Sequence, residues 1–249
     1  MKITLEIQRF NPKKDKEPYF EKFDVEVEKT FRILDAFVFI YRNMDGSLGF
    51  RKSCAHGICG SDAVRINGME KLACKTLVQD VAEADGDIVR VEPLRHLEIQ
   101  KDLMVDQTTF LDKFKTVKPY FLPREVVKEK EYYQSPAQRK EFDAATKCIN
   151  CGACYSACPI LDKNQNFLGP AALVHAARFV FDSRESGLEN RIDVLDHADG
   201  VWSCENHFEC TRVCPRGIPI TKLINLTKRK IKKYREERGE TSQDPGKKG

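Results

Sequence analysis

The chain of 249 residues lacks any apolar run long enough to cross a membrane, and it lacks the apolar core of a secretory signal. A transmembrane helix needs roughly 18 apolar residues, whereas the stretch from Ile33 to Tyr41 is short and contains Asp35. Charged Lys2 and Glu6 stand where a signal would be apolar. We therefore expect a chain that is not exported and that folds in a reducing compartment.

Aromatic residues are scarce in the one strongly basic part of the sequence. From Lys222 to Gly249 there are ten Lys or Arg against four Asp or Glu, and Tyr234 is the only aromatic residue. Binding of single-stranded nucleic acid uses aromatic rings interleaved with basic residues. The tail therefore predicts a solvated face or an anionic surface, and we expect no nucleic-acid partner.

Cysteine, in contrast, is abundant, with ten residues in tight groups. In a reducing compartment such groups are typical of metal ligands, and disulfides are the competing interpretation. Cys148, Cys151 and Cys154 lie too close together in sequence for each to find a distant partner. The pattern therefore favours metal binding.

The first hundred residues predict a small α+β domain. Alternating apolar residues mark strands around Ile3–Ile7 and Phe23–Val27, and further strands are expected at 62–66 and 89–91. Asn67-Gly68 predicts a turn. Ile33, Leu34, Phe37 and Tyr41 share one helical face, for which Thr30 is the expected N-cap.

The second half predicts mostly helices interrupted by two cysteine segments. Helices are expected at 110–117, 171–181 and 222–238, and residues 124–131 predict an exposed helix or a linker. We expect a first domain over residues 1–105, a helical domain over 106–238, and a disordered tail over 239–249.

The first cysteine group resembles the plant-type spacing for a 2Fe–2S cluster. That spacing is C-x4-C-x2-C with a distant fourth Cys, and the chain has Cys54, Cys59 and Cys74 at the matching places. Asp62 stands where the third Cys belongs. Its oxygen can coordinate iron, so we favour Asp62 as the fourth ligand; the alternative is a surface residue beside an incomplete site.

The second group, Cys148-x2-Cys151-x2-Cys154-x3-Cys158-Pro159, is the bacterial ferredoxin run, whose fourth Cys binds the other cluster. A zinc site is the alternative, but four thiolates around zinc do not require this run followed by Pro.

The third group, Cys204-x5-Cys210-x3-Cys214-Pro215, overlays on the second with His207 opposite Cys151. The crossing rule then gives a 4Fe–4S cluster on Cys148, Cys151, Cys154 and Cys214. Cys158, Cys204 and Cys210 remain, which is a ligand set for a 3Fe–4S cluster. The alternative is that His207 binds a fourth iron, since imidazole also ligates iron–sulfur centres.

This arrangement resembles the iron–sulfur subunit of succinate dehydrogenase and fumarate reductase over nearly the whole chain. The flanking residues that carry the resemblance are Arg51-Lys52-Ser53-Cys54, Gly57-Ile58-Cys59-Gly60-Ser61, Ile66-Asn67-Gly68, Leu72-Ala73-Cys74, Lys101-Asp102-Leu103-Met104-Val105-Asp106, Gly169-Pro170-Ala171-Ala172 and Asp182-Ser183-Arg184. Some members of the family also have Asp at the place of Asp62. The resemblance implies an α+β fold class, with an N-terminal β-grasp plant-type ferredoxin domain followed by an all-α bacterial-ferredoxin-like domain.

The resemblance also implies a function. A partner flavoprotein with FAD would oxidise succinate, and electrons would pass through the 2Fe–2S, 4Fe–4S and 3Fe–4S clusters to a quinone. This chain would be a non-catalytic electron-transfer subunit with no catalytic residue of its own. A membrane anchor subunit, often with haem b, would hold it at the cytoplasmic face of the plasma membrane.

Four residues match family positions near the quinone or the anchor: Pro159, Ile160, His207 and Lys228. Ubiquinone-type relatives have a Trp five residues after the position of Cys158, whereas this chain has Lys163. The departure favours menaquinone. Two other functions stay open on the sequence alone: an iron–sulfur subunit for a related fumarate reductase or for a thiol-linked or heterodisulfide-linked flavoenzyme, and a zinc-stabilised nucleic-acid-binding module.

Overall fold

A computed structural model describes residues 1–28, 30–125, 129 and 131–239. The chain divides into two compact units, and each is described by itself. The first unit contains residues 1–108 and 149–157, and the second contains residues 109–148 and 158–249. The expected tail over 239–249 lies outside the described residues except for Gly239, and the predicted helix or linker over 124–131 lies partly outside them.

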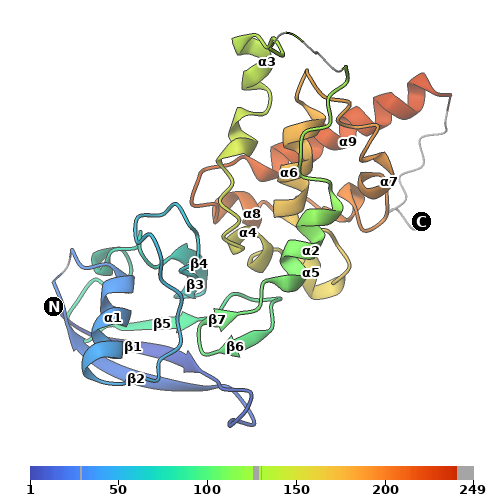
Figure 1. The fold of residues 1–249 in the computed structure, drawn as a ribbon. Helices are drawn as coiled ribbons and strands as arrows, with labels where there is room; N and C mark the ends of the chain where they lie inside the picture. Colours follow the sequence, from blue (N-terminus) through green and yellow to red (C-terminus); the bar gives the residue numbers. More distant parts are fainter. Residues whose placement is uncertain (29, 126–128, 130, 240–249) are drawn as a thin grey trace. The chain divides into compact units, whose positions relative to one another are not determined.

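The first unit is built on a five-stranded sheet with the strand order β2-β1-β5-β3-β4 (Figure 1). β1 pairs in parallel with β5, and the other neighbours are antiparallel. The strands are β1 (Lys2–Arg9), β2 (Tyr19–Glu26), β3 (Ala63–Ile66), β4 (Met69–Leu72) and β5 (Ile88–Glu92). The predicted strands are confirmed, because their alternating residues place one apolar face in the core: Leu5, Ile7, Ile66, Val89 and Val91 are all fully buried.

A two-residue turn at Asn67-Gly68 joins β3 to β4, as the sequence predicts. Both residues have positive φ, 49° and 79°, which is the backbone that a tight hairpin of this kind requires. A second, two-stranded ribbon of β6 (Ile99–Lys101) and β7 (Met104–Val105) was not predicted.

The helix α1 (Ile33–Asn43) packs against β2 and buries Ile33, Leu34, Phe37 and Ile40. The prediction that Thr30 caps this helix is wrong, since Arg32 holds the N-cap position. Backbone carbonyls replace a side-chain cap: the amide of Ile33 donates to Thr76 O at 2.9 Å, and that of Leu34 donates to Ala73 O at 3.1 Å. The start of α1 therefore holds the backbone on both sides of Cys74.

The first unit also contains a 3₁₀ turn (Val78–Asp80) and the short helix α4 (Ala153–Ser156), which contacts β4. The Ser156 hydroxyl donates to Glu70 Oε1 at 2.8 Å and accepts from the amide of Arg95 at 2.8 Å. Although α4 is distant in sequence from the sheet, Ser156 thus hydrogen-bonds it to the sheet domain, close to Cys151 and Cys154.

The second unit is helical (Figure 1). Its helices are α2 (Thr108–Thr116, of which Thr108 belongs to the first unit), α3 (Pro136–Lys140), α5 (Ile160–Lys163), α6 (Pro170–Val180), α7 (Ile192–Leu195), α8 (Glu209–Arg212) and α9 (Ile220–Glu237), with 3₁₀ turns at Asp143–Lys147 and Val201–Ser203. The helices predicted at 110–117, 171–181 and 222–238 are confirmed with ends shifted by one or two residues.

The core of the second unit lies between α6 and α9. α6 is buried on nearly all sides, which fits its Ala, Leu and Val content. α9 is amphipathic, and residues at helical spacing, including Leu223, Ile224, Thr227 and Ile231, face the core. Both α8 and the Val201–Ser203 turn contact α9, so this helix supports the loop between Cys204 and Cys210.

Candidate iron–sulfur sites

The first cysteine loop points backbone amides at a cysteine sulfur. Cys54 Sγ accepts from the amides of His56 at 3.5 Å and Cys59 at 3.3 Å. The loop can wrap in this way because Ala55, Gly57 and Gly60 take positive φ values of 58°, 81° and 68°. Hydrogen bonds from the backbone of His56, Cys59 and Ile58 lower the pKa of Cys54 to about 6. A sulfur in this setting is prepared to serve as a thiolate ligand.

Asp62 lies beside Cys74 in the interior of the first unit. Its side chain is only 4% exposed, so it is not a surface residue. One carboxylate oxygen, Oδ2, accepts from the amide of Cys74 at 2.5 Å, whereas Oδ1 is buried and has no hydrogen-bond partner among the described residues. Burial, followed by the neighbouring Asp62, raises the pKa of Cys74 to about 12. A buried thiol and an orphaned buried oxygen fit a pair of iron ligands, because a bound cation would satisfy both.

The second cysteine run is shared between the two units. Cys151 and Cys154 belong to the first unit, and Cys148, Cys158 and the more distant Cys214 belong to the second. In the first unit the run makes a close contact with the first cysteine loop: a Cβ added at Gly60 would lie 2.6 Å from Cβ of Cys151. Only glycine fits at position 60.

The third cysteine run repeats the backbone of the second. Asn150 and Gly152 have φ values of 53° and 81°, and the equivalent residues Asn206 and Phe208 have 63° and 64°. Both loops end in a short helix, α4 after Gly152 and α8 after Phe208. His207 therefore holds the backbone position that Cys151 holds in the other loop, as the overlay of the two sequences predicts.

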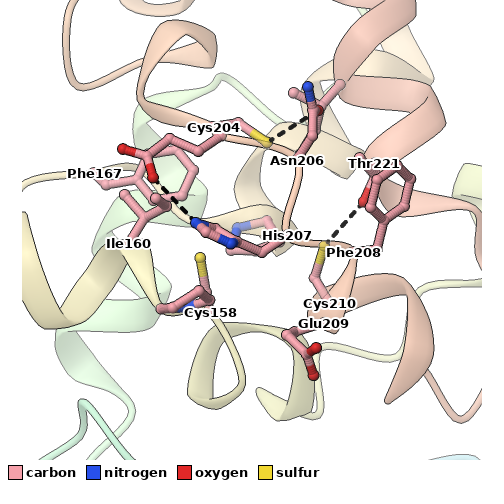
Figure 2. A pocket seen from close by; sticks show the side chains of 14 residues that line it. Cys158, Ile160, Phe167, Cys204, Asn206, His207, Phe208, Glu209, Cys210 and Thr221 are labelled. Atoms are coloured by element: carbon pink, nitrogen blue, oxygen red, sulfur yellow. Dashed lines mark hydrogen bonds and ion pairs between the residues drawn. The ribbon is translucent and has the colours of Figure 1, made fainter.

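Three of the cysteines line one pocket in the second unit. Cys158, Cys204 and Cys210 all line this pocket, and His207 lines it with them (Figure 2). Burial raises the pKa of Cys158 to about 11. Burial also raises the pKa of Cys210, against the effect of a hydrogen bond to Thr221. Three thiols around one small pocket fit a cluster with three protein ligands.

The described residues contain no group of three His, Cys, Asp or Glu side chains that could hold a single metal ion. None of the helices in the described part of the chain combines the length and the apolar character that crossing a bilayer requires.

Two family models match the chain: a 2Fe-2S iron-sulfur cluster binding domain over residues 4–112 and a 4Fe-4S dicluster domain over residues 144–218. The fumarate reductase iron-sulfur subunit of Mycobacterium tuberculosis is 40% identical over 219 residues, which cover 87% of each chain. The succinate dehydrogenase iron-sulfur subunit of Coxiella burnetii is 38% identical, over 89% of this chain and 94% of that one. The chain belongs to the family of iron–sulfur subunits of fumarate reductase and succinate dehydrogenase.

A solved structure has the same fold as this chain. A chain of the Mycobacterium smegmatis Sdh1 complex in the apo form matches with a TM-score of 0.84 and 23% identity, over 94% of this chain and 97% of that one. The chain is thus an iron–sulfur subunit of the succinate dehydrogenase and fumarate reductase family with a mixed helix and sheet fold.

Three of the four residues expected near a quinone line the same pocket as the three cysteines: Pro159, Ile160 and His207. His207 Nε2 lies 3.1 Å from Glu205 Oε2, and that carboxylate lies 3.8 Å from Lys163 Nζ. Lys163, which departs from the ubiquinone-type relatives, is therefore the outer member of a chain of charged and polar groups that ends at the pocket.

Lys228 is not among the residues that line this pocket, but its side chain contacts the backbone of Cys204. Its Nζ donates to Cys204 O at 2.7 Å, and it lies over the ring of Trp202 at 5.9 Å. The Trp202 indole donates to Asp196 Oδ1 at 2.7 Å. Trp202 thus packs as a structural residue between α9 and the cysteine loop.

Sequence reasoning missed Thr211 and Thr221, whose hydroxyls lie beside Cys210. Neither residue is part of the cysteine spacing, and a threonine at the start of a helix has no distinguishing pattern. Thr211 is next to Cys210 in α8, but only the packing of α9 against α8 brings Thr221 to the sulfur.

Proposed function

We propose that the chain carries electrons between the FAD of a partner flavoprotein and a membrane quinone in a succinate:quinone oxidoreductase. The single observation that supports this most strongly is the convergence of Cys158, Cys204 and Cys210 on one pocket of the second unit, with His207 at the position that Cys151 holds in the other run. Three thiols and no fourth cysteine are the ligand set for a cluster with one corner free of protein ligand.

The residues divide into three ligand sets. In this proposal Cys54, Cys59, Asp62 and Cys74 hold a 2Fe–2S cluster, Cys148, Cys151, Cys154 and Cys214 hold a 4Fe–4S cluster, and Cys158, Cys204 and Cys210 hold a 3Fe–4S cluster. When bound, these groups supply one-electron carriers. The chain supplies the thiolates, the amides that stabilise their charge at Cys54, and the buried surroundings that exclude water from Cys158 and Cys210.

We also propose a fold and bounds for each of the two domains. The first domain would be a β-grasp ferredoxin domain over residues 1–105, and the second a helical ferredoxin domain over 106–238. A mixed five-stranded sheet with one covering helix supports the first assignment, and a bundle of helices that carries the cysteine runs supports the second.

Membership of the family supports a proposal for the partners and the location. We place the chain at the cytoplasmic face of the plasma membrane, bound to a flavoprotein and to an anchor subunit that can hold haem b. Pro159, Ile160, His207 and Lys228 would lie nearest the quinone. Menaquinone is the proposed acceptor, because the position of a tryptophan hydrogen-bond donor is taken by the exposed Lys163.

The test is anaerobic purification of the complex from its own membranes, with subunit identification, iron and acid-labile sulfide analysis, quinone extraction and low-temperature EPR. We expect a succinate-oxidising flavoprotein to co-purify, a 3Fe–4S signal in the oxidised protein, and bound menaquinone. A thiol-linked or heterodisulfide-linked flavoenzyme in its place would overturn the assigned partner. A colourless protein with zinc and no sulfide would overturn the electron-carrier function itself.

A further inference from the structure

A buried hydroxyl lies against one of the three pocket cysteines. Thr221 is 1% exposed at the start of α9, and its Oγ1 lies 3.5 Å from Cys210 Sγ, within the distance of a hydrogen bond to sulfur (Figure 2). Thr221 is the second residue of this 18-residue helix. The hydroxyl therefore approaches the sulfur from the helix end that carries positive partial charge.

A second threonine supports the first. Thr211 Oγ1 lies 3.1 Å from Thr221 Oγ1, and it accepts from the amide of Thr221 at 3.0 Å. The two residues therefore form a small closed network that begins at a backbone amide of α9 and ends at Cys210.

Counting protons gives this network a direction. A cysteine that binds iron is a thiolate without a proton, so Cys210 Sγ can only accept and the Thr221 hydroxyl must donate to it. Thr221 Oγ1 can then accept the proton of Thr211, which in turn accepts from the Thr221 amide. Hydrogen bonds that run in one direction in this way strengthen one another.

The usual alternative for a helical threonine is absent at this position. Thr227, in the same helix and equally buried, donates to Leu223 O at 3.0 Å, one turn back. The corresponding carbonyl for Thr221 would belong to Gly217, which precedes the helix. The Thr221 hydroxyl thus turns to the sulfur instead of to its own helix.

We propose that Thr221, oriented by Thr211, is a positioning residue that raises the reduction potential at the Cys158, Cys204 and Cys210 site, which rests on the proposed function of that site. Reduction adds negative charge to a group held by Cys210, and a donor to the ligand sulfur stabilises the more negative state. The last carrier in the chain thereby becomes a better electron acceptor.

The test is an EPR-monitored redox titration of the purified complex with Thr221→Val, which keeps the shape of the side chain and removes the hydroxyl. We expect the equilibrium constant for one-electron reduction to fall about tenfold, a downward shift of about 59 mV in the midpoint potential. Thr221→Ser, which retains the donor, should stay near the wild-type midpoint. Thr227→Val is the matched control, and its midpoint should not move.

The outcomes separate the inference from the function on which it rests. Absence of the 3Fe–4S signal in the wild-type complex would overturn the proposed function. A signal whose midpoint is the same in Thr221→Val and wild type, or a shift equal to that of Thr227→Val, would overturn the inference alone. If Thr221→Val does not assemble, Thr211→Val removes the hydroxyl that orients Thr221 and that also lies beside Cys210: a downward shift supports the inference, and an unchanged midpoint overturns it.

Discussion

The carboxylate of Asp62 accepts a hydrogen bond from the backbone amide of Cys74 at 2.5 Å, and this contact fixes the side chain so that its second oxygen is buried without a partner in the described structure. A buried carboxylate oxygen that lacks a partner is costly. Its retention in the interior fits a role as the fourth ligand of the first cluster, in place of the cysteine that the plant-type spacing would have.

Replacement of Asp62 by Ala should therefore lower the 2Fe–2S content of the purified protein by roughly tenfold or more, because the cluster loses one ligand. Visible absorbance and the EPR signal of the reduced protein measure this content. Asp62→Cys is the control, since it restores a four-cysteine set and should retain the cluster. An unchanged signal in Asp62→Ala would show that Asp62 is a bystander.

Replacement of His207 by Cys should convert the third site to a 4Fe–4S cluster, because it places a thiolate at the backbone position that Cys151 holds in the second run. The expected readout is loss of the 3Fe–4S signal in the oxidised protein and a second 4Fe–4S signal on reduction. His207→Ala is the control and should keep the 3Fe–4S signal. Loss of iron from His207→Ala would instead identify His207 as a ligand.

The candidate sites were predictable from sequence to the extent that they are local. Spacing within Cys148–Cys158 and Cys204–Cys214 determines loop geometry over a few residues, so the equivalence of His207 to Cys151 could be found by overlay. The contact of Thr221 with Cys210 could not, because it depends on how the start of α9 packs against α8. The burial of Asp62 likewise depends on the backbone around Cys74.

Replacement of Arg191 by Met should destabilise the second unit by about 3–5 kcal/mol, because it leaves a buried partner uncompensated. Arg191 and Glu185 form an ion pair whose side chains are both fully buried, and the guanidinium also donates to the carbonyls of Val117, Lys118 and Tyr120. The urea midpoint, followed by far-UV circular dichroism, measures the change.

The matched control is Lys115→Met, which breaks the exposed pair between Lys115 and Asp112. Exposed pairs contribute less than about 1 kcal/mol, so the midpoint should barely move. Equal shifts for Arg191→Met and Lys115→Met would contradict a structural role for the buried pair.

The stability of the second unit should fall in acid because of His175. Burial, with a smaller effect of Arg178, lowers the pKa of His175 to about 4, below its ordinary value of about 6.5. Between these values the unfolded chain binds the proton more readily than the folded chain, so stability is complete above about pH 6.5 and falls as the pH decreases towards 4. The expected loss is on the order of 3 kcal/mol.

Thermal unfolding as a function of pH measures this effect. His175→Gln should flatten the profile between pH 6.5 and 4, because the proton-binding group is removed. His197→Gln is the control, since that side chain is 64% exposed, and it should leave the profile as in wild type. A profile that stays steep in His175→Gln would assign the acid sensitivity to other groups.

The elements of the fold were predictable where buried residues recur at a regular spacing along the sequence. Alternation revealed β1 and β2, helical spacing revealed α1 and α2, and the proline at its start indicated α6. The ribbon of β6 and β7 was missed because its strands of three and two residues are too short to show a pattern. The cap of α1 was assigned wrongly because distant carbonyls at Ala73 and Thr76, and not a local side chain, satisfy its first amides.

The close contact between Gly60 and Cys151 bears on the rate of electron transfer. Electron tunnelling weakens steeply with the thickness of protein between donor and acceptor, and a missing side chain leaves the smallest possible barrier between the first cysteine loop and a proposed ligand of the second cluster. Both residues belong to one compact unit. If Cys151 holds the second cluster as proposed, the approach of the first loop to this ligand depends on packing inside that unit, and any larger residue at position 60 would push the two apart.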